Sequence, residues 1–295
     1  MKIVPKVING MKLFLVEGWP GIHSELIQWN GKDGEEPREP EFMYVFKKEL
    51  PVDGIIIDLG ANIGYNTLSA SKLIKEKNGK GRIYSIEPDS RNIELLERAV
   101  KENKCEDIVS IHRCAIYNKT GRKALHLSNQ TNLNSLIKTE NTIQTIEVET
   151  FTLEDFMSGK GYPNFIKMDV EGAEVEVLEG GMKLFENNFP CGILMETHQK
   201  MYTPQRNLSK QLKKLVENGF NIKTVMSAGV AIPDVFKKYK YYPSMIFNSG
   251  IFSRGLYNDI SNEHAIEFAS NIIYQKTSTG HISPKVVRSI LIERK

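Results

Sequence analysis

From residue 54 onward, short apolar runs rich in β-branched residues alternate with longer segments in which apolar residues recur every three or four positions. The first pattern is typical of buried parallel strands and the second of amphipathic helices. The predicted strands are 54–60, 82–86, 108–112, 164–170, 192–196, 220–225 and 286–293, and the predicted helices are 65–77, 89–103, 173–185 and 208–217. Because strands alternate with helices, we expect an α/β fold with a doubly wound, mostly parallel sheet.

The regions that flank this pattern differ from it. Before it, residues 11–16 and 23–29 have the composition of two strands joined by a turn, and the apolar spacing over 37–50 predicts a helix. Residues 115–149 alternate polar and apolar positions, which favours an antiparallel excursion. We therefore predict three parts: an N-terminal hairpin and helix extension over 1–50, a catalytic α/β domain formed by 51–225 and 286–295, and an insert over 226–285.

The composition narrows the class of protein. A chain of 295 residues suits one catalytic domain with extensions, and 40% hydrophobic with 25% charged residues is ordinary for a globular protein. The 39 basic and 36 acidic side chains are too balanced to predict a polyanionic partner. Three cysteines without a CxxC pair argue against a disulfide framework or a zinc site. With no signal peptide pattern and no apolar window of roughly twenty residues, we expect a cytoplasmic protein without a membrane span.

The strongest candidate motif joins the first core strand to the next helix, and it reads Asp58-Leu59-Gly60-Ala61-Asn62-Ile63-Gly64. Glycines here allow a sharp turn and a close approach of the backbone to a ligand. The pyrophosphate-binding pattern GxGxxG is absent, and an acidic residue precedes the glycines. This arrangement suits a ligand with an amino acid end, although a tight strand-to-helix turn with no ligand would carry the same glycines.

Carboxylates follow two further predicted strands. Glu87, in Glu87-Pro88-Asp89, stands where an acidic residue can accept hydrogen bonds from ribose hydroxyls. Asp169 and Glu171 stand at the end of the fourth core strand and should face the same crevice as Asp58 and Glu87. Four carboxylates in one site repel one another unless a cation is present, and the sulfonium and ammonium groups of S-adenosylmethionine would supply two positive charges. The alternative is that Glu171 and Glu174 stabilise the N-terminus of the following helix.

A histidine follows the fifth predicted strand, in Leu194-Met195-Glu196-Thr197-His198. His198 alone among the six histidines falls at a strand end near these carboxylates, and histidine is the usual proton acceptor near neutral pH. Glu196 could orient it or bind a polar group of the substrate. A histidine in a loop is also commonly a surface or packing residue.

Six segments between Glu41 and His198, in this order and spacing, resemble the FkbM family of methyltransferases: GIIIDLGANIGYNTLSA, YSIEPD, CAIYNKTG, VETFTLEDF, FIKMDVEGAEVEVLEGG and ILMETH. The resemblance implies a Rossmann-like class I methyltransferase fold whose last strand is antiparallel. It also implies S-adenosylmethionine as the cofactor and methyl transfer to oxygen, on a hydroxyl of a sugar, glycan or other small metabolite. In this family the segment matching 58–64 holds the methionine part of the cofactor, and the residue matching Glu87 holds the ribose.

Glu41 resembles the acidic position that precedes the first core strand in the family. The complete set of predicted cofactor residues is Glu41, Asp58, Gly60, Ala61, Asn62, Gly64, Glu87, Pro88, Ala115, Asp169 and Glu171. The predicted catalytic residues are Asp169, Glu196 and His198, with Asp169 or His198 assisting deprotonation of the acceptor. We predict no metal.

The insert separates two strands that are adjacent in methyltransferase folds, so it should emerge on the active-site side and help to form the substrate pocket. It contains a predicted helix over 263–274 and several aromatic residues among cations: Tyr239, Tyr241, Tyr242, Phe247 and Phe252. These rings could stack on sugars or bases, and a packed core beneath a lid would explain them equally well.

Three other functions fit parts of the pattern. An RNA methyltransferase is less favoured because the Asn/Asp-Pro-Pro-aromatic signature of base N-methylation is absent. A nicotinamide-dependent oxidoreductase is disfavoured by the missing GxGxxG. A non-catalytic protein of the same fold would retain the motifs without turnover. A small-molecule or glycan hydroxyl remains the favoured acceptor, and nucleic acid is the second choice.

Overall fold

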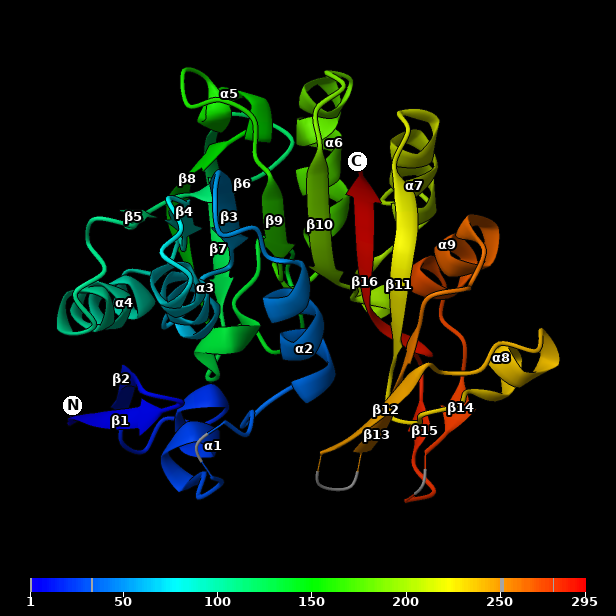
Figure 1. Ribbon diagram of the computed structural model, residues 1–295, viewed down its shortest axis with the longest axis horizontal. Coiled ribbons are helices and arrows are strands. Elements are labelled where there is room, and N and C mark those ends of the chain that lie inside the picture. The colour runs from blue at the N-terminus through cyan, green and yellow to red at the C-terminus, as the bar shows by residue number, and fades with distance from the viewer. Residues whose placement is uncertain (1, 33, 250–251, 278) are drawn as a thin grey trace.

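A sheet of nine strands organises the computed structural model, which describes residues 2–32, 34–249, 252–277 and 279–295 (Figure 1). The strand order is β12-β13-β11-β16-β10-β9-β3-β4-β5. Five neighbouring strands are parallel: β3 (Ile55–Leu59), β4 (Arg82–Ile86), β5 (Val109–His112), β9 (Phe165–Met168) and β10 (Cys191–Glu196). Each coincides with a predicted strand to within a few residues.

The last strand of the chain, β16 (Val287–Arg294), lies between β10 and β11 (Asn221–Ser227) and is antiparallel to both. The predicted fold class, a doubly wound and mostly parallel sheet with an antiparallel last strand, is therefore confirmed. β16 is buried on both faces, as its apolar sequence requires.

Helices cover both faces of the sheet. Successive residues of a strand point to opposite faces, so strands that are apolar throughout need a cover of helices on each side. Ile56 of β3 packs with α2 (Pro40–Glu49), α3 (Tyr65–Glu76) and α4 (Ser90–Glu102). Ile57 packs in a second core with α5 (Leu153–Met157), α6 (Glu174–Phe185), α7 (Leu208–Glu217) and α9 (Asn262–Ser270). None of the helices in the described ranges has the length and apolarity that crossing a bilayer requires.

The N-terminal extension departs from one prediction. β2 (Met11–Val16) forms a hairpin, but its partner is β1 (Ile3–Ile8), and residues 23–29 are not a strand. They belong mostly to α1 (Ile22–Gln28). The buried ring of His23 accepts a hydrogen bond from the Val16 amide through Nδ1, at 3.2 Å, so the helix closes the end of β2 instead of pairing with it.

Two excursions complete the chain. β6 (Ala115–Ile116), β7 (Gly121–Leu127) and β8 (Gln144–Phe151) form a small sheet in which β7 and β8 are antiparallel, as expected, and a short helix η1 (Thr131–Leu133) lies between them. The insert contributes α8 (Asp234–Lys238), β12 (Met245–Ser249), β13 (Phe252–Tyr257), α9, β14 (Gln275–Lys276) and β15 (Ile282–Ser283). β13 pairs with β11 and extends the sheet, while α9 ends at Ser270, before the predicted 274. A second short helix, η2 (Gln199–Met201), follows β10.

Candidate active site

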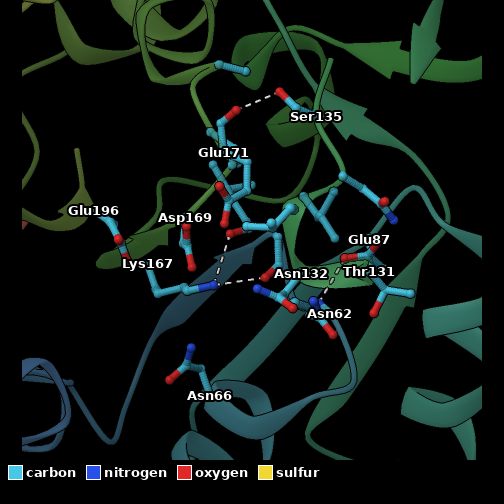
Figure 2. A pocket seen from close by; sticks show the side chains of 18 of the residues that line it. Asn62, Asn66, Glu87, Thr131, Asn132, Ser135, Lys167, Asp169, Glu171 and Glu196 are labelled. Atoms are coloured by element: carbon cyan, nitrogen blue, oxygen red, sulfur yellow. Dashed lines mark hydrogen bonds between the residues drawn. The ribbon is translucent and has the colours of Figure 1, made fainter. Parts of the chain in front are cut away.

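A cavity of about 400 Å³ opens where β3, β4, β9 and β10 end (Figure 2). The strand ends bring together side chains from distant parts of the sequence. Ten predicted site residues line the cavity: Gly60, Ala61, Asn62, Glu87, Pro88, Ala115, Asp169, Glu171, Glu196 and His198. Glu41, Asp58 and Gly64 are not among its lining residues, and their assignment to the cofactor stays a prediction.

The glycine-rich turn fits tightly against the end of β9. Gly60 has a φ of +73°, and a Cβ there would lie 2.0 Å from the Asp169 carbonyl oxygen. Asn62 also has a positive φ, and its amide donates to Glu87 Oε2 at 2.8 Å. Gly64 serves packing instead, because a Cβ on it would lie 2.5 Å from Leu96 of α4. The turn, which forms the floor of the cavity, therefore needs a glycine at 60 to approach the end of β9 and a glycine at 64 to let α4 pack against it.

Glu87 is buried and held in place by the backbone. Its Oε1 accepts from the Asp89 amide at 2.9 Å and from Asn92 at 3.3 Å, in addition to the bond from Asn62. Burial raises the pKa of Glu87 to about 7, against the lowering effect of these donors. A carboxylate has about four acceptor sites, so Glu87 retains capacity for a ligand hydroxyl.

Asp58 lies below the cavity floor. It accepts from Thr67 Oγ1 at 2.6 Å, and the Lys167 ammonium is 3.1 Å from its Oδ1. Lys167 also donates to the Gly60 carbonyl at 2.9 Å and lines the cavity itself. Asp58 thus acts on the cavity through Lys167, a residue that the sequence analysis missed. The sequence did contain a signal for this role. A lysine within the buried apolar strand 164–170 needs a carboxylate or another acceptor close to its ammonium group.

Glu41 is also buried and paired. Its Oε1 is 2.7 Å from Arg254 of β13 and 3.9 Å from Nε of Arg288 of β16. Burial raises the pKa of Glu41, and the Arg254 guanidinium opposes that shift. These contacts join α2 to β13 and β16. Arg288 reaches the cavity beside Glu39 and forms an ion pair with it.

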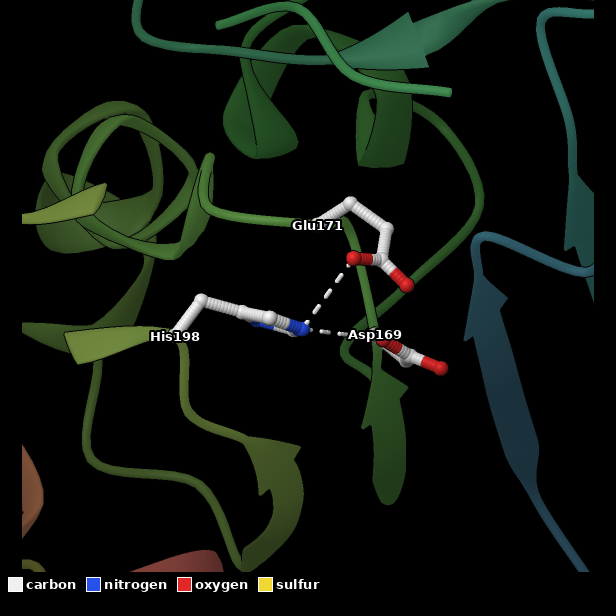
Figure 3. A group of neighbouring side chains, drawn as sticks. All are labelled: Asp169, Glu171 and His198. Carbon is white, nitrogen blue, oxygen red and sulfur yellow. Dashed lines mark ion pairs between the residues drawn. The ribbon is translucent and has the colours of Figure 1, made fainter. Parts of the chain in front are cut away.

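His198 stands among carboxylates (Figure 3). Its Nδ1 is 2.8 Å from Glu174 Oε1, while its Nε2 is 3.3 Å from Glu171 Oε2 and 4.0 Å from Asp169 Oδ1. Glu196 Oε1 lies 3.9 Å from Nε2. The fully buried Glu174 therefore orients the ring, a role that the sequence analysis considered for Glu196.

Tyr202 completes this arrangement. Its hydroxyl donates to Glu174 Oε2 at 3.0 Å and accepts from the His198 amide at 2.8 Å. Glu174 Oε1 also accepts from the Gly172 amide at 3.0 Å. These bonds fix both the carboxylate and the backbone of His198, so the ring presents Nε2 toward the cavity.

The charges of the cavity are partly balanced by the protein itself. Burial opposes ionisation of Glu196, but Arg288 and Lys285 outweigh it and hold the pKa of Glu196 at about 2. Burial and repulsion by Glu196 raise the pKa of Asp169 to about 7. Burial disfavours a charged His198, yet Glu174 and Glu171 raise the pKa of that ring well above its usual range. Lysine and arginine side chains thus supply part of the positive charge that the sequence analysis assigned to the cofactor.

Asp169, Glu171 and His198 offer three ligand atoms within 4.8 Å of one another, so they could hold a metal ion. Carboxylate and imidazole ligands are common for divalent ions. The sequence analysis predicts no metal here, and that remains a prediction.

The aromatic residues of the insert do not reach the cavity in the part of the chain that the structure describes. The ring of Tyr239 lies 4.1 Å from that of His264, which stacks on Phe268 of α9. Phe247 contacts Tyr44 of α2. The insert contributes Lys285 to the cavity. Tyr241 and Phe247 are half-buried against the core, while Tyr239, Tyr242 and Phe252 are exposed, so the packed-core role holds for only part of these rings.

Solved structures with a similar arrangement have low sequence identity to this chain. A precorrin-6y C5,15-methyltransferase from Geobacter metallireducens has 10% identity and a TM-score of 0.42, over 87% of this chain and 89% of that one. A SAM-dependent O-methyltransferase from Thermotoga maritima has 12% identity and a TM-score of 0.41, over 86% and 64%. Aeropyrum pernix fibrillarin, solved with bound S-adenosyl-L-methionine, has 17% identity and a TM-score of 0.35, over 60% and 62%. No curated protein matches the chain.

The family comparison is decisive. The model described as the methyltransferase FkbM domain matches residues 58–222, which is more than half of the 295 residues. The matched segment contains the glycine-rich turn, Glu87, Asp169, Glu171 and His198. It confirms the predicted family and, with it, S-adenosylmethionine as the cofactor. The chain belongs to the FkbM family of methyltransferases.

Proposed function

We propose that this methyltransferase acts on oxygen and transfers the methyl group to a hydroxyl of a sugar, glycan or other small metabolite, with His198 as the proton acceptor. The observation that supports this proposal is the position of His198 Nε2. It lies on the cavity wall between Asp169 and Glu171, while Glu174 holds Nδ1 from behind. A histidine whose Nδ1 is held by a buried carboxylate is suited to accept a proton at Nε2 once the ring is neutral.

The cavity suits the cofactor in size and offers carboxylates for its positive charge. At about 400 Å³ it is in the range of ligand pockets for molecules of this size. We place the ribose at Glu87, the amino acid end at the turn that contains Gly60, and the sulfonium beside Asp169. The positive sulfonium would then lie near a carboxylate, whose ionised form it favours.

The reaction needs no covalent enzyme intermediate. The acceptor oxygen forms a bond to the methyl carbon as the carbon–sulfur bond breaks, and the hydroxyl proton passes to His198 Nε2. The products are the methyl ether, S-adenosylhomocysteine and a protonated imidazole. The protein contributes alignment of the two reactants and a fixed base.

The charge of His198 predicts the pH dependence. Against the effect of burial, Glu174 and Glu171 raise the pKa of His198 well above its usual range, so the protonated ring, which cannot accept a further proton, persists to higher pH than in an ordinary histidine. The neutral form increases with pH, so kcat/KM should rise by up to about tenfold per pH unit below that pKa. In Glu171→Gln the rise should move to lower pH, since one of the carboxylates that favour the charged ring is gone. A profile that is flat across the neutral range in both proteins would contradict this assignment.

Glu87→Gln should weaken cofactor binding by about 10- to 100-fold, the effect of losing a hydrogen bond to a charged group. The glutamine NH2 group would also face one of the two backbone amides that now donate to Glu87, that of Asn62 or that of Asp89. Calorimetric titration with S-adenosylhomocysteine measures the change. Glu94→Gln, an exposed position on α4, is the matched control and should bind as the wild type does.

The acceptor class is tested with a radiolabelled methyl donor and separate carbohydrate, lipid and RNA extracts. The proposal predicts label in the carbohydrate or small-metabolite fraction, recovered as a methyl ether. Label in RNA alone would favour the RNA methyltransferase considered above. Absence of label from every fraction, with intact cofactor binding, would favour a non-catalytic role.

A further inference from the structure

A second cavity, of about 360 Å³, adjoins the first. The two share a wall formed by Leu133, Ser135, Glu171, His198 and Lys285. The second cavity extends from that wall past Lys200 and Met201 of η2, Thr139 and Asn141 of the β7–β8 connection, and Pro284 of the insert. Three segments that the α/β core positions independently therefore meet around it.

The two cavities differ in their balance of charge. Carboxylates and cations mix around the first, whose charged lining residues are Glu39, Glu87, Asp169, Glu171 and Glu196 with Arg38, Lys167, Lys285 and Arg288. Among the residues that line the second, Glu171 is the only carboxylate, and it faces His198. Lys200 and Lys285 line the second cavity.

The two lysines are not equally neutralised. Lys285 Nζ lies 3.7 Å from Glu196 Oε1, so its charge is partly balanced. No carboxylate within the described ranges lies at ion-pair distance from Lys200. Lys200 is exposed and two residues beyond His198. The Lys200 ammonium is therefore available to solvent or to a ligand in the second cavity.

We propose that the second cavity binds the methyl acceptor and that the acceptor carries an anionic substituent, a phosphate or a carboxylate, recognised by Lys200. This inference rests on the proposed function. The cofactor takes the first cavity, and the acceptor hydroxyl reaches the methyl group across the shared wall at His198. Thr139 and Asn141 supply a hydroxyl and an amide group for the remaining polar groups of the acceptor, whereas the Ser135 hydroxyl already donates to the Glu171 carbonyl.

The variant Lys200→Glu tests the electrostatic part. It should raise KM for the active extract fraction by roughly tenfold, with S-adenosylhomocysteine affinity within twofold of wild type. In the wild type, KM should increase with salt, and in Lys200→Glu this dependence should disappear or reverse. Lys210→Glu, an exposed position on α7, makes the same charge change away from the cavity and should alter neither value.

The variant Thr139→Trp tests the location. Thr139 is half-buried and lines only the second cavity, so the larger ring should fill that cavity from its loop side. Methyl transfer should fall by at least about 100-fold while S-adenosylhomocysteine binding persists. Transfer within twofold of wild type would overturn the assignment of this cavity.

The acceptor class is tested on the extract itself, with the wild-type enzyme and labelled methyl donor. The acceptor should be retained by an anion exchanger at neutral pH. The extract is treated before the methyl transfer reaction. If phosphatase treatment abolishes the uptake of label, the acceptor carries a phosphate, and if carbodiimide amidation abolishes it, the acceptor carries a carboxylate. An acceptor that flows through the exchanger and still takes up label after both treatments would overturn the anionic acceptor. The proposed methyltransferase function would remain intact. No uptake from any fraction counts against the proposed function itself.

Discussion

Replacing His198 with glutamine is expected to lower kcat by roughly 10²- to 10⁴-fold, the usual contribution of a positioned general base. Glutamine keeps a polar side chain of similar length but cannot take up the hydroxyl proton. Because His198 Nδ1 is bound to Glu174 and only Nε2 faces the cavity, the loss should appear in kcat and leave cofactor affinity within a few-fold. Single-turnover transfer and calorimetry measure the two quantities separately.

The matched control is His264→Gln, since His264 packs against Tyr239 and Phe268 and does not line the described cavity. Its kcat should equal that of the wild type. If His198→Gln retains a rate within a few-fold of wild type, His198 is not the base, and Asp169 becomes the remaining predicted proton acceptor.

Replacing Asp58 with alanine is expected to reduce the free energy of unfolding by about 3–5 kcal/mol, the cost of leaving a buried charge without its partner. The Lys167 ammonium would remain buried with only carbonyl acceptors, at Gly60 and Leu59. Urea denaturation measures the loss. Cofactor binding should weaken as well, because Lys167 supports the cavity floor that carries Gly60.

The double variant Asp58→Asn, Lys167→Met is the control for this effect. It removes both charges and keeps an acceptor for Thr67, so it should recover much of the stability lost in Asp58→Ala. A loss below about 1 kcal/mol in Asp58→Ala would mean that Lys167 finds other compensation and that the pair does not support the floor.

The α/β core could be predicted because its signals are local. Runs such as 54–60 and 192–196 are apolar on both faces, as a strand in the centre of a sheet requires, and in the helices between them apolar residues recur every three or four positions. Residues 23–29 could not be assigned in this way. Their pattern suits a strand or a short helix, and the pairing of β2 with β1 decides between the two.

Most residues of the site could be predicted from the sequence, but the contacts between its carboxylates and its cations could not. The strand ends identify Glu87, Asp169, Glu171, Glu196 and His198, and all five line the cavity. Which carboxylate touches which cation depends on side-chain directions that sequence spacing does not give. Glu174, the first residue of α6, proved to hold His198, and Asp58 proved to pair with Lys167.

A crystal structure of the complex with S-adenosylhomocysteine tests the central assignment most directly. We expect the nucleoside and amino acid ends in the cavity of about 400 Å³, with a ribose hydroxyl on Glu87, the sulfur beside Asp169, and the second cavity open at His198. Binding of the product elsewhere on the molecule, with Glu87 and Asp169 free of contact, would contradict the account.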